Sequence, residues 1–129
     1  MLTYSNEWGQ YPAQWLRNLF PTADVDDRSI CDIGMGDVTS YDKVHLFAGI
    51  GGWEYALQLA DWPNSEPVWT GSCPCQPFSR AGTRKGTKDE RHLWPTMFKI
   101  IERHRPPVVF GEQVAGKSGL EWFDGVRVN

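Results

Sequence analysis

The sequence predicts one α/β domain built around a parallel sheet. Three observations predict it: apolar runs of strand length alternate with helix-periodic stretches, Gly and Pro mark short breaks between them, and 129 residues allow a single hydrophobic core. In open parallel sheets, ligands bind beyond the carboxyl ends of the strands. We therefore expect functional residues directly after the predicted strands.

The first part of the chain predicts a helix and a strand. Leu2–Tyr4 is a short apolar start, and a helix opens at Pro12, because proline suits the first helical turn. Its apolar side is expected to contain Trp15, Leu16, Leu19 and Phe20. After Pro21 closes that helix, the small apolar cluster Ile30, Cys31 and Ile33 indicates the end of a strand, with Asp32 inside it.

The remainder predicts two further strand and helix units. Val44–Ala48 is an apolar run that leads through Gly49–Gly52 into a helix at Trp53–Ala60, in which Tyr55, Ala56, Leu59 and Ala60 suit a helix. A short strand at Pro67–Thr70 precedes the loop Gly71–Gly82. A helical stripe then contains Leu93, Met97, Ile100 and Ile101, and Pro107–Phe110 is expected to be a buried strand.

Charge and cysteine content limit the partners and the compartment. With 13 Lys and Arg against 16 Asp and Glu, the net charge is −3, so any contact with a polyanion must be local. The three cysteines are Cys31, Cys73 and Cys75. Their odd number, the absence of a secretory leader and the absence of a long apolar run predict a cytoplasmic protein with reduced thiols and no membrane contact.

The glycine turn is the first candidate site. Glycines after a strand permit a tight bend, let backbone N–H groups approach a ligand and direct a helix N-terminus at negative charge. Gly49–Gly52 lacks the third glycine of the dinucleotide fingerprint. A cofactor-binding turn and a purely structural turn therefore both remain open at this point.

The loop after the next strand contains the second candidate. Pro74 and Pro77 flank Cys75 and restrain its orientation, and a cation such as Arg80 favours the thiolate, so Cys75 is a candidate nucleophile. One alternative is an inert buried cysteine. Another is half of a zinc site formed by Cys73 and Cys75, but two more ligands are needed and the histidines are scattered, so we expect no metal.

Glu112 is the third candidate, because it follows directly on the strand Pro107–Phe110, where open α/β sheets present functional side chains. The alternative is a glutamate that caps the next helix or faces solvent.

Together, His45–Trp53, Gly71–Gly82 and Gly111–Val114 resemble, in order, the cofactor, nucleophile and acid motifs of DNA cytosine-5 methyltransferases. The resemblance implies a Rossmann-like S-adenosylmethionine-dependent fold. It also implies methyl transfer to C5 of a cytosine flipped out of double-stranded DNA, through a covalent bond to Cys75, with Glu112 stabilising the charge that develops on the ring. The resemblance further implies a restriction-modification enzyme from a bacterium or a phage.

Two further motifs stand before the glycine turn instead of after it. Tyr4–Trp8 looks like the acidic ribose-binding motif of the family, and Ile30–Ile33 looks like its adenine-contacting segment. The resemblance thus implies a permuted order. Residues 1–43 would form the ribose and adenine wing, and residues 44–129 would hold the glycine turn, the nucleophile loop and the acid. We expect the linker Gly34–Lys43 to return the chain to the sheet centre.

The resemblance implies two sets of binding residues. In the cofactor pocket, Glu7 would accept the ribose hydroxyls, Trp8 would stack on adenine, and Asp32 with Ile33 would contact its edge. The other expected pocket residues are Phe47, Gly49, Ile50, Gly51, Gly52 and Pro74. The expected DNA contacts are Gln76, Ser79, Arg80, Arg84, Lys85, Lys88 and Arg91, although a solvated loop with a chance cluster of cations is an equal reading.

The sequence also departs from the family pattern. His45 stands where the family usually has Asp, and Gln113 where it usually has Asn. The arginine-bearing active-site motif, the target-recognition region and the late cofactor segment are absent. We therefore expect a fold incomplete at its C-terminus, completed by a missing C-terminal half or a second chain. The alternative function is a truncated remnant that binds S-adenosylmethionine without catalysis.

Overall fold

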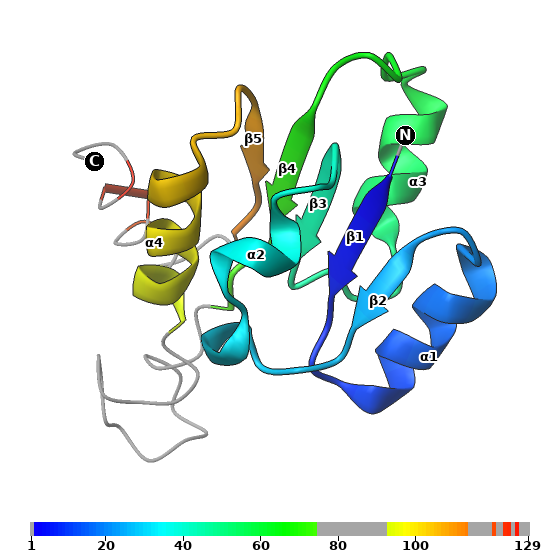
Figure 1. Ribbon diagram of the computed structural model, residues 1–129, viewed down its shortest axis with the longest axis horizontal. Helices are drawn as coiled ribbons and strands as arrows, with labels where there is room; N and C mark the ends of the chain where they lie inside the picture. The colour runs from blue at the N-terminus through cyan, green and yellow to red at the C-terminus, as the bar shows by residue number, and fades with distance from the viewer. Residues whose placement is uncertain (1, 75–92, 114–119, 121–122, 125, 127–129) are drawn as a thin grey trace.

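The computed structural model describes residues 2–74, 93–113, 120, 123–124 and 126, and a five-stranded parallel sheet forms its centre (Figure 1). The strands are β1 (Thr3–Asn6), β2 (Asp24–Asp26), β3 (Lys43–Leu46), β4 (Val68–Gly71) and β5 (Val109–Gly111). Their order in the sheet is β2-β1-β3-β4-β5, and all four pairings are parallel. The predicted α/β fold with a Rossmann-like parallel sheet is confirmed.

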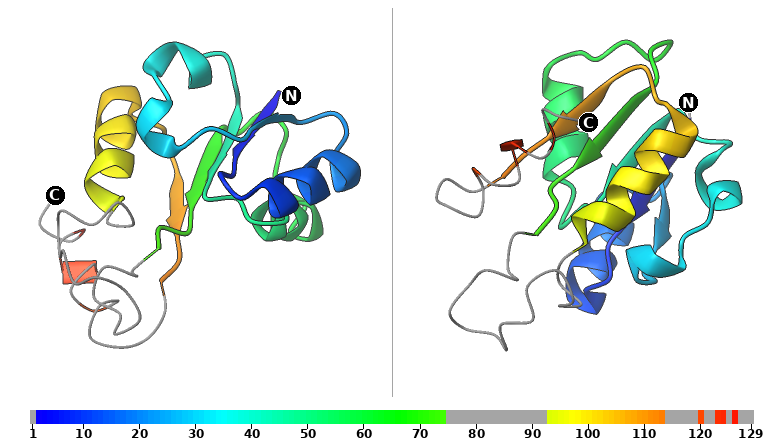
Figure 2. Two further views of the ribbon diagram at one scale, coloured as in Figure 1. Left: turned by 90° about the horizontal axis from the view of Figure 1, so that it is seen from below. Right: turned by 90° about the vertical axis from the view of Figure 1, so that its left-hand side faces the viewer.

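Helices cover both faces of this sheet (Figure 2). On one face lie α1 (Gln10–Leu19) and α3 (Gly52–Leu59); on the other lie a 3-10 helix, η1 (Ile30–Asp32), α2 (Met35–Val38) and α4 (Trp94–His104). The chain therefore passes from β3 to α3 on one face, and from the neighbouring β4 to α4 on the opposite face. Ligands of open α/β sheets bind at the carboxyl ends of strands whose connections diverge in this way.

Successive residues of a strand point to opposite faces of the sheet. In this sheet the residues on one face are apolar and those on the other include polar side chains. Val44 and Leu46 are fully buried in the apolar core, with Met97 and Ile100 of α4. The intervening His45 is also buried, but it faces α3 and takes part in a polar network. The apolar side holds the layers together, and the polar side fixes how α3 sits on the sheet.

The predicted strand end at residues 30–33 is wrong. This cluster forms the 3-10 helix η1, where the Ser29 hydroxyl accepts a hydrogen bond from the Cys31 N–H and the side chains of Ile30 and Ile33 are buried in the core. The strand of this region is instead β2, a three-residue edge strand. An edge strand is covered less than a central one, so β2 needs no apolar run.

The linker from the edge of the sheet to its centre is longer than expected. It runs over residues 27–42 and contains η1 and α2, whereas the sequence predicted only Gly34–Lys43. A parallel crossover usually takes a dozen residues or more, and this connection meets that requirement.

Three predicted elements exist, and the structure shows which of their residues are buried. Helix α1 begins at Gln10, not at Pro12, and buries Ala13 and Leu16, while the expected Trp15 and Leu19 are exposed. Helix α3 buries Glu54 and Leu57, while Tyr55 and Leu59 are exposed. Strand β5 lies at the sheet edge, where Val109 is exposed, so it is not the buried strand that was predicted. Within the described part of the chain, every helix is too short or too polar to cross a membrane.

Candidate active site

The glycine turn connects β3 to α3 through an unusual backbone. Phe47, Gly49 and Gly51 have φ angles of 53°, 60° and 97°, all in the left-handed region. The Gly51 N–H donates to the Ala48 carbonyl at 3.1 Å, and α3 begins at the next residue. Because a phenylalanine pays a steric cost for positive φ, Phe47 stores strain at the carboxyl end of β3, where the expected cofactor pocket lies.

The glycines of this turn serve different purposes. A Cβ atom on Gly51 would lie 2.2 Å from Cε2 of Phe20, so this glycine is required by packing. A Cβ atom on Gly49 or on Gly52 would meet nothing within 4 Å. The space above Gly49 and Gly52 is therefore open to a ligand, whereas Gly51 is covered by the end of α1.

Glu7 lies beside this turn, directly after β1. One carboxylate oxygen accepts the Gly49 N–H at 2.9 Å, and the other accepts the Gly9 N–H at 2.9 Å. A carboxylate offers about four lone-pair sites, so each oxygen can accept one more hydrogen bond. Trp8 and Ile50 are 67% and 55% exposed, and their apolar surfaces are available at the same edge of the sheet.

Of the two residues expected to contact adenine, Asp32 lies on the surface and Ile33 lies in the core. Asp32 is exposed at the end of η1, and its backbone carbonyl accepts a 3.4 Å hydrogen bond from Arg28. The side chain of Ile33 is 8% exposed and belongs to the apolar core. Of this pair, the Asp32 side chain is the one presented to solvent.

The stem of the cysteine loop is held from several sides. A Cβ atom on Gly71 would lie 1.9 Å from Cε of Met97, so α4 packs directly on the end of β4. The Cys73 carbonyl accepts a 2.7 Å hydrogen bond from the Gln113 side chain, and the Cys73 side chain is buried in the core. The half-buried Pro74 is the last described residue of the stem.

The expected nucleophile and DNA contacts lie outside the described residues. These are Cys75, Gln76, Ser79, Arg80, Arg84, Lys85, Lys88 and Arg91. Glu112 is described: it is exposed directly after β5, and its N–H donates to the Gly71 carbonyl at 3.3 Å. Glu112 and the start of the cysteine loop at Gly71 are therefore neighbours at the C-terminal ends of β5 and β4. Among the described residues, no three His, Cys, Asp or Glu side chains gather into a possible metal site.

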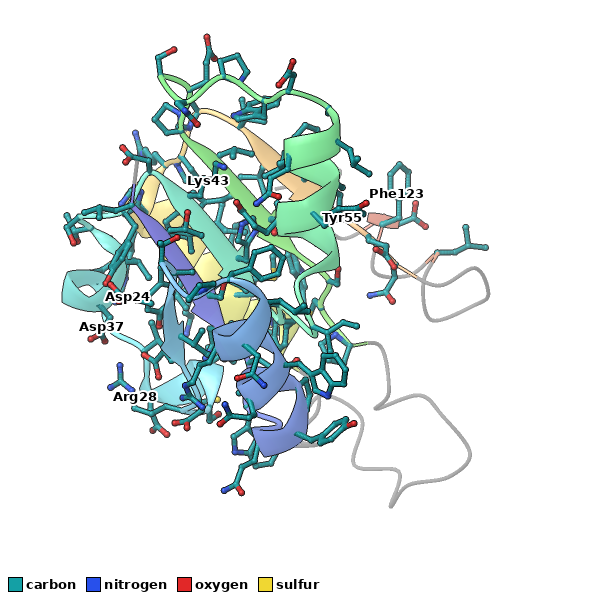
Figure 3. The ribbon with its side chains drawn as sticks, turned by 90° about the vertical axis from the view of Figure 1, so that its right-hand side faces the viewer. Asp24, Arg28, Asp37, Lys43, Tyr55 and Phe123 are labelled. Carbon is teal, nitrogen blue, oxygen red and sulfur yellow. The ribbon has the colours of Figure 1, made fainter. Side chains whose placement is uncertain are left out.

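A buried polar network under α3 was not predicted. Glu54 accepts hydrogen bonds from His45 at 2.8 Å and from Lys43 at 3.2 Å, and the other ring nitrogen of His45 pairs with the Thr70 hydroxyl at 2.7 Å. Figure 3 shows Lys43 on the side of the sheet that α3 covers. Burial raises the pKa of Glu54, but the hydrogen bond from His45 and the charge of Lys43 outweigh burial, so the pKa lies below its ordinary value. A sequence signal existed, because Glu54 has helical spacing with the apolar Leu57.

A second charged cluster stabilises the β2 edge, on the far side of the sheet from β5 (Figure 3). Arg28 donates to Asp26 at 2.6 Å and also pairs with Asp37 at 3.2 Å, and the Tyr4 hydroxyl donates to Asp26 at 2.7 Å. The hydrogen bonds from Arg28 are the main reason that the pKa of Asp26 is lowered to about 2. Burial and the bond to Asp26 raise the pKa of Tyr4. The cluster joins β1, β2 and α2.

Comparison with known proteins relates the second half of the chain to one family. Residues 61–119 match the family model for C-5 cytosine-specific DNA methylase. Through this segment the chain is similar to the C-5 cytosine-specific DNA methylases. The methylase segment includes β4, α4 and β5 and therefore carries both Cys75 and Glu112.

Three curated relatives are Type II methyltransferases. M.AplI of Arthrospira platensis is 39% identical over 56 residues, which are 43% of this chain and 16% of the relative. M.NgoMIV of Neisseria gonorrhoeae is 39% identical over 46 residues, 36% of this chain and 15% of the relative. M.DsaV of Dactylococcopsis salina is 43% identical over 47 residues, 36% of this chain and 13% of the relative. The chain thus spans 13–16% of the length of these relatives. No solved structure matches it significantly.

Proposed function

We propose that this chain provides the S-adenosylmethionine site and the catalytic cysteine of a DNA cytosine-5 methyltransferase. The observation that carries the proposal is the 2.9 Å hydrogen bond from the Gly49 N–H to Glu7. It joins the acidic segment after β1 to the glycine turn after β3, and β3 pairs directly with β4 of the methylase segment. Cofactor groups and catalytic groups would thus share one edge of the sheet.

The sheet order supports a permuted arrangement of the family motifs. If β3 is taken as the first strand, then β1 is the second, β2 the third, and β4 and β5 the fourth and fifth. The spatial order then reads 3-2-1-4-5, which is the order of doubly wound nucleotide-binding sheets. We infer that the wing formed by residues 1–43 precedes the glycine turn in the chain but occupies its usual place in space.

The residues of the site fit S-adenosylmethionine chemically. Glu7 retains lone pairs for the two ribose hydroxyls, and Trp8 offers an exposed aromatic surface on which a purine can stack. Asp32 adds a second exposed carboxylate for the adenine edge. The open space above Gly49 and Gly52 admits the part of the ligand that approaches the backbone. Phe47 and Ile50 would contribute to the same pocket. Pro74 would border the pocket from the cysteine stem.

Cys75 and Glu112 would perform the chemistry on cytosine. When bound, S-adenosylmethionine supplies an electrophilic methyl group. The Cys75 thiolate adds to C6 of the ring, and Glu112 holds a proton at N3, so that electron density develops at C5. After C5 has gained the methyl group, it loses its proton to solvent and the Cys75 thiolate leaves. A reduced thiol is required, which favours a cytoplasmic location.

Double-stranded DNA is the proposed substrate, and the target base must leave the stack at a cost of a few kcal/mol. The net charge of −3 gives no general attraction to DNA. The cations Arg80, Arg84, Lys85, Lys88 and Arg91 would supply it locally, and Gln76 and Ser79 would contact the target strand. The Type II designation of the relatives supports a role in restriction-modification.

A second candidate is a chain that binds S-adenosylmethionine without catalysis. The observation that favours it is the short overlap, since the chain spans 13–16% of the curated relatives. In this candidate, the site at Glu7 and Gly49 binds the cofactor, but Cys75 does not react with cytosine.

Covalent trapping on DNA that contains 5-fluorocytosine tests the proposal. Fluorine at C5 cannot leave as a proton, so an adduct between Cys75 and the base persists and adds the mass of the DNA strand to the protein. The assay compares the wild-type protein, Cys75→Ser and Cys31→Ser by intact mass, with cofactor present. Cys31 is exposed in η1 and is the matched control. Calorimetry measures cofactor binding in parallel.

The three outcomes separate the candidates. An adduct in the wild type and in Cys31→Ser, but not in Cys75→Ser, supports the methyltransferase. Cofactor binding without an adduct supports the second candidate. If neither signal appears, the assignment of the Glu7 and Gly49 site is wrong.

A further inference from the structure

Trp53 forms a junction between three parts of the candidate site. It is the second residue of α3, immediately after the glycine turn. Its indole N–H donates to the Ser72 hydroxyl at 2.9 Å, and its ring stacks on Phe110 with centroids 5.8 Å apart and an interplanar angle of 13°. One half-buried side chain of α3 therefore contacts both the segment that follows β4 and the strand β5.

Each partner of Trp53 lies within three residues, along the chain, of a proposed catalytic residue. Ser72 lies in the stem that leads from β4 to Cys75, and Phe110 lies in β5 just before Glu112. On the apolar face, Met97 of α4 packs against the end of β4. Trp53 holds the stem from the opposite face, so the end of β4 is fixed between α3 and α4.

We infer that Trp53 is a positioning residue. It fixes residues 71–74, which lead to Cys75, and the strand β5, which leads to Glu112, relative to the glycine turn. The inference rests on the proposed function for its catalytic meaning, whereas the anchoring itself is a property of the fold. Through Trp53, the helix whose N-terminus borders the proposed cofactor pocket would set where Cys75 and Glu112 stand. Small displacements of reacting groups cost large factors in rate, so such an anchor matters for methyl transfer.

A comparison within the molecule separates this role from simple packing. Trp62 also contacts Phe110, edge-on, with centroids 5.7 Å apart. Its indole N–H, however, donates at 2.8 Å to the carbonyl of Glu66 in the loop between α3 and β4. Trp62 therefore covers the same ring without a bond to the cysteine stem, and it provides a matched control.

Hydrogen exchange of the full chain tests the anchoring without requiring activity. The variants are Trp53→Phe, which keeps an aromatic ring but removes the donor, Ser72→Ala, which removes the acceptor, and Trp62→Phe as the control. We expect the amides of residues 71–73 to exchange about fivefold faster in the first two variants, and at the wild-type rate in Trp62→Phe. The amides of β1 should not change in any of them. Ser72→Ala removes little packing, so it remains informative if Trp53→Phe folds poorly.

A double-variant cycle and the trapping assay test whether the hydrogen bond between Trp53 and Ser72 affects the reaction of Cys75. Because Trp53 and Ser72 share one hydrogen bond, the double variant should exchange no faster than either single variant. The rate of Cys75 trapping should fall about tenfold in both single variants while the Kd for S-adenosylmethionine stays within about twofold of the wild type.

Unchanged exchange at residues 71–73, or an equal increase in Trp62→Phe, would overturn the inference. A wild-type protein that neither binds the cofactor nor forms the adduct would instead overturn the proposed function, and the exchange data would still decide whether Trp53 anchors the stem.

Discussion

Glu7 accepts the backbone N–H of Gly49 at 2.9 Å across 42 residues of sequence. The second carboxylate oxygen accepts the Gly9 N–H at 2.9 Å, so the side chain is fixed between the ends of β1 and β3. Such bonds to an ionised carboxylate are stronger than neutral ones. The same group therefore stabilises the glycine turn and presents its remaining lone pairs at the carboxyl edge.

Replacing Glu7 with Gln is expected to damage both properties. An amide has one carbonyl oxygen, so its NH2 group would face either the Gly9 N–H or the Gly49 N–H, donor against donor. We expect a loss of about 1–2 kcal/mol in the free energy of unfolding, measured by urea denaturation. Calorimetry should show S-adenosylmethionine binding weakened by about tenfold or more.

The matched control for Glu7 is Glu66→Gln. Glu66 is exposed in the loop between α3 and β4, far from the glycine turn along the chain. It should leave stability and cofactor binding unchanged. Equal behaviour of the two variants would show that the bonds of Glu7 contribute nothing specific.

Alanine at Gly51 and at Gly52 should affect stability differently. Gly51 has a φ of 97°, and its Cβ would lie 2.2 Å from the Phe20 ring, so Gly51→Ala should lower the free energy of unfolding by about 3 kcal/mol. Gly52 begins α3 and its Cβ would meet nothing within 4 Å, so Gly52→Ala should be neutral or slightly stabilising in urea denaturation.

Cofactor binding by Gly52→Ala then tests what occupies the open space. If S-adenosylmethionine lies above the turn, the added methyl group should weaken its binding although the protein remains fully folded. Wild-type affinity in Gly52→Ala would place the ligand elsewhere.

Local patterns were sufficient for some elements of the fold. The stripe that includes Met97 and Ile100 predicted α4, and both side chains are buried in the core. The glycine turn was predicted from its composition, and Gly49 and Gly51 do have positive φ. These features depend on a few consecutive residues, which is why the sequence alone reveals them.

Other features depend on partners that are distant in the chain. Strand β2 is the short sequence DVD, whose status as a strand rests on pairing with β1. Glu54 is buried because His45 and Lys43 on β3 neutralise and bond it, although a helix glutamate would be expected in solvent. Only the family resemblance led us to expect Glu7 near the glycine turn, since no local pattern relates Glu7 to Gly49, and the hydrogen bond between them was not predicted.

The Asp26 cluster predicts how stability depends on pH. The pKa of Asp26 is lowered from an ordinary value of 3.8 to about 2, chiefly by hydrogen bonds from Arg28, so folding favours the ionised carboxylate. Its contribution is fully present above about pH 4 and is lost as the pH falls from about 4 towards 2. Asp26→Asn should therefore lower the free energy of unfolding at pH 7 by about 1 kcal/mol, a figure that allows for solvent screening of the half-exposed Arg28. The difference from wild type should shrink between pH 4 and pH 3 in urea denaturation.

Asp27→Asn is the control for this prediction, because it removes an exposed ion pair with Arg17 and should change stability little at any pH. A gap between Asp26→Asn and wild type that stays constant from pH 7 to pH 3 would mean that the carboxylate charge is not what stabilises the β2 edge.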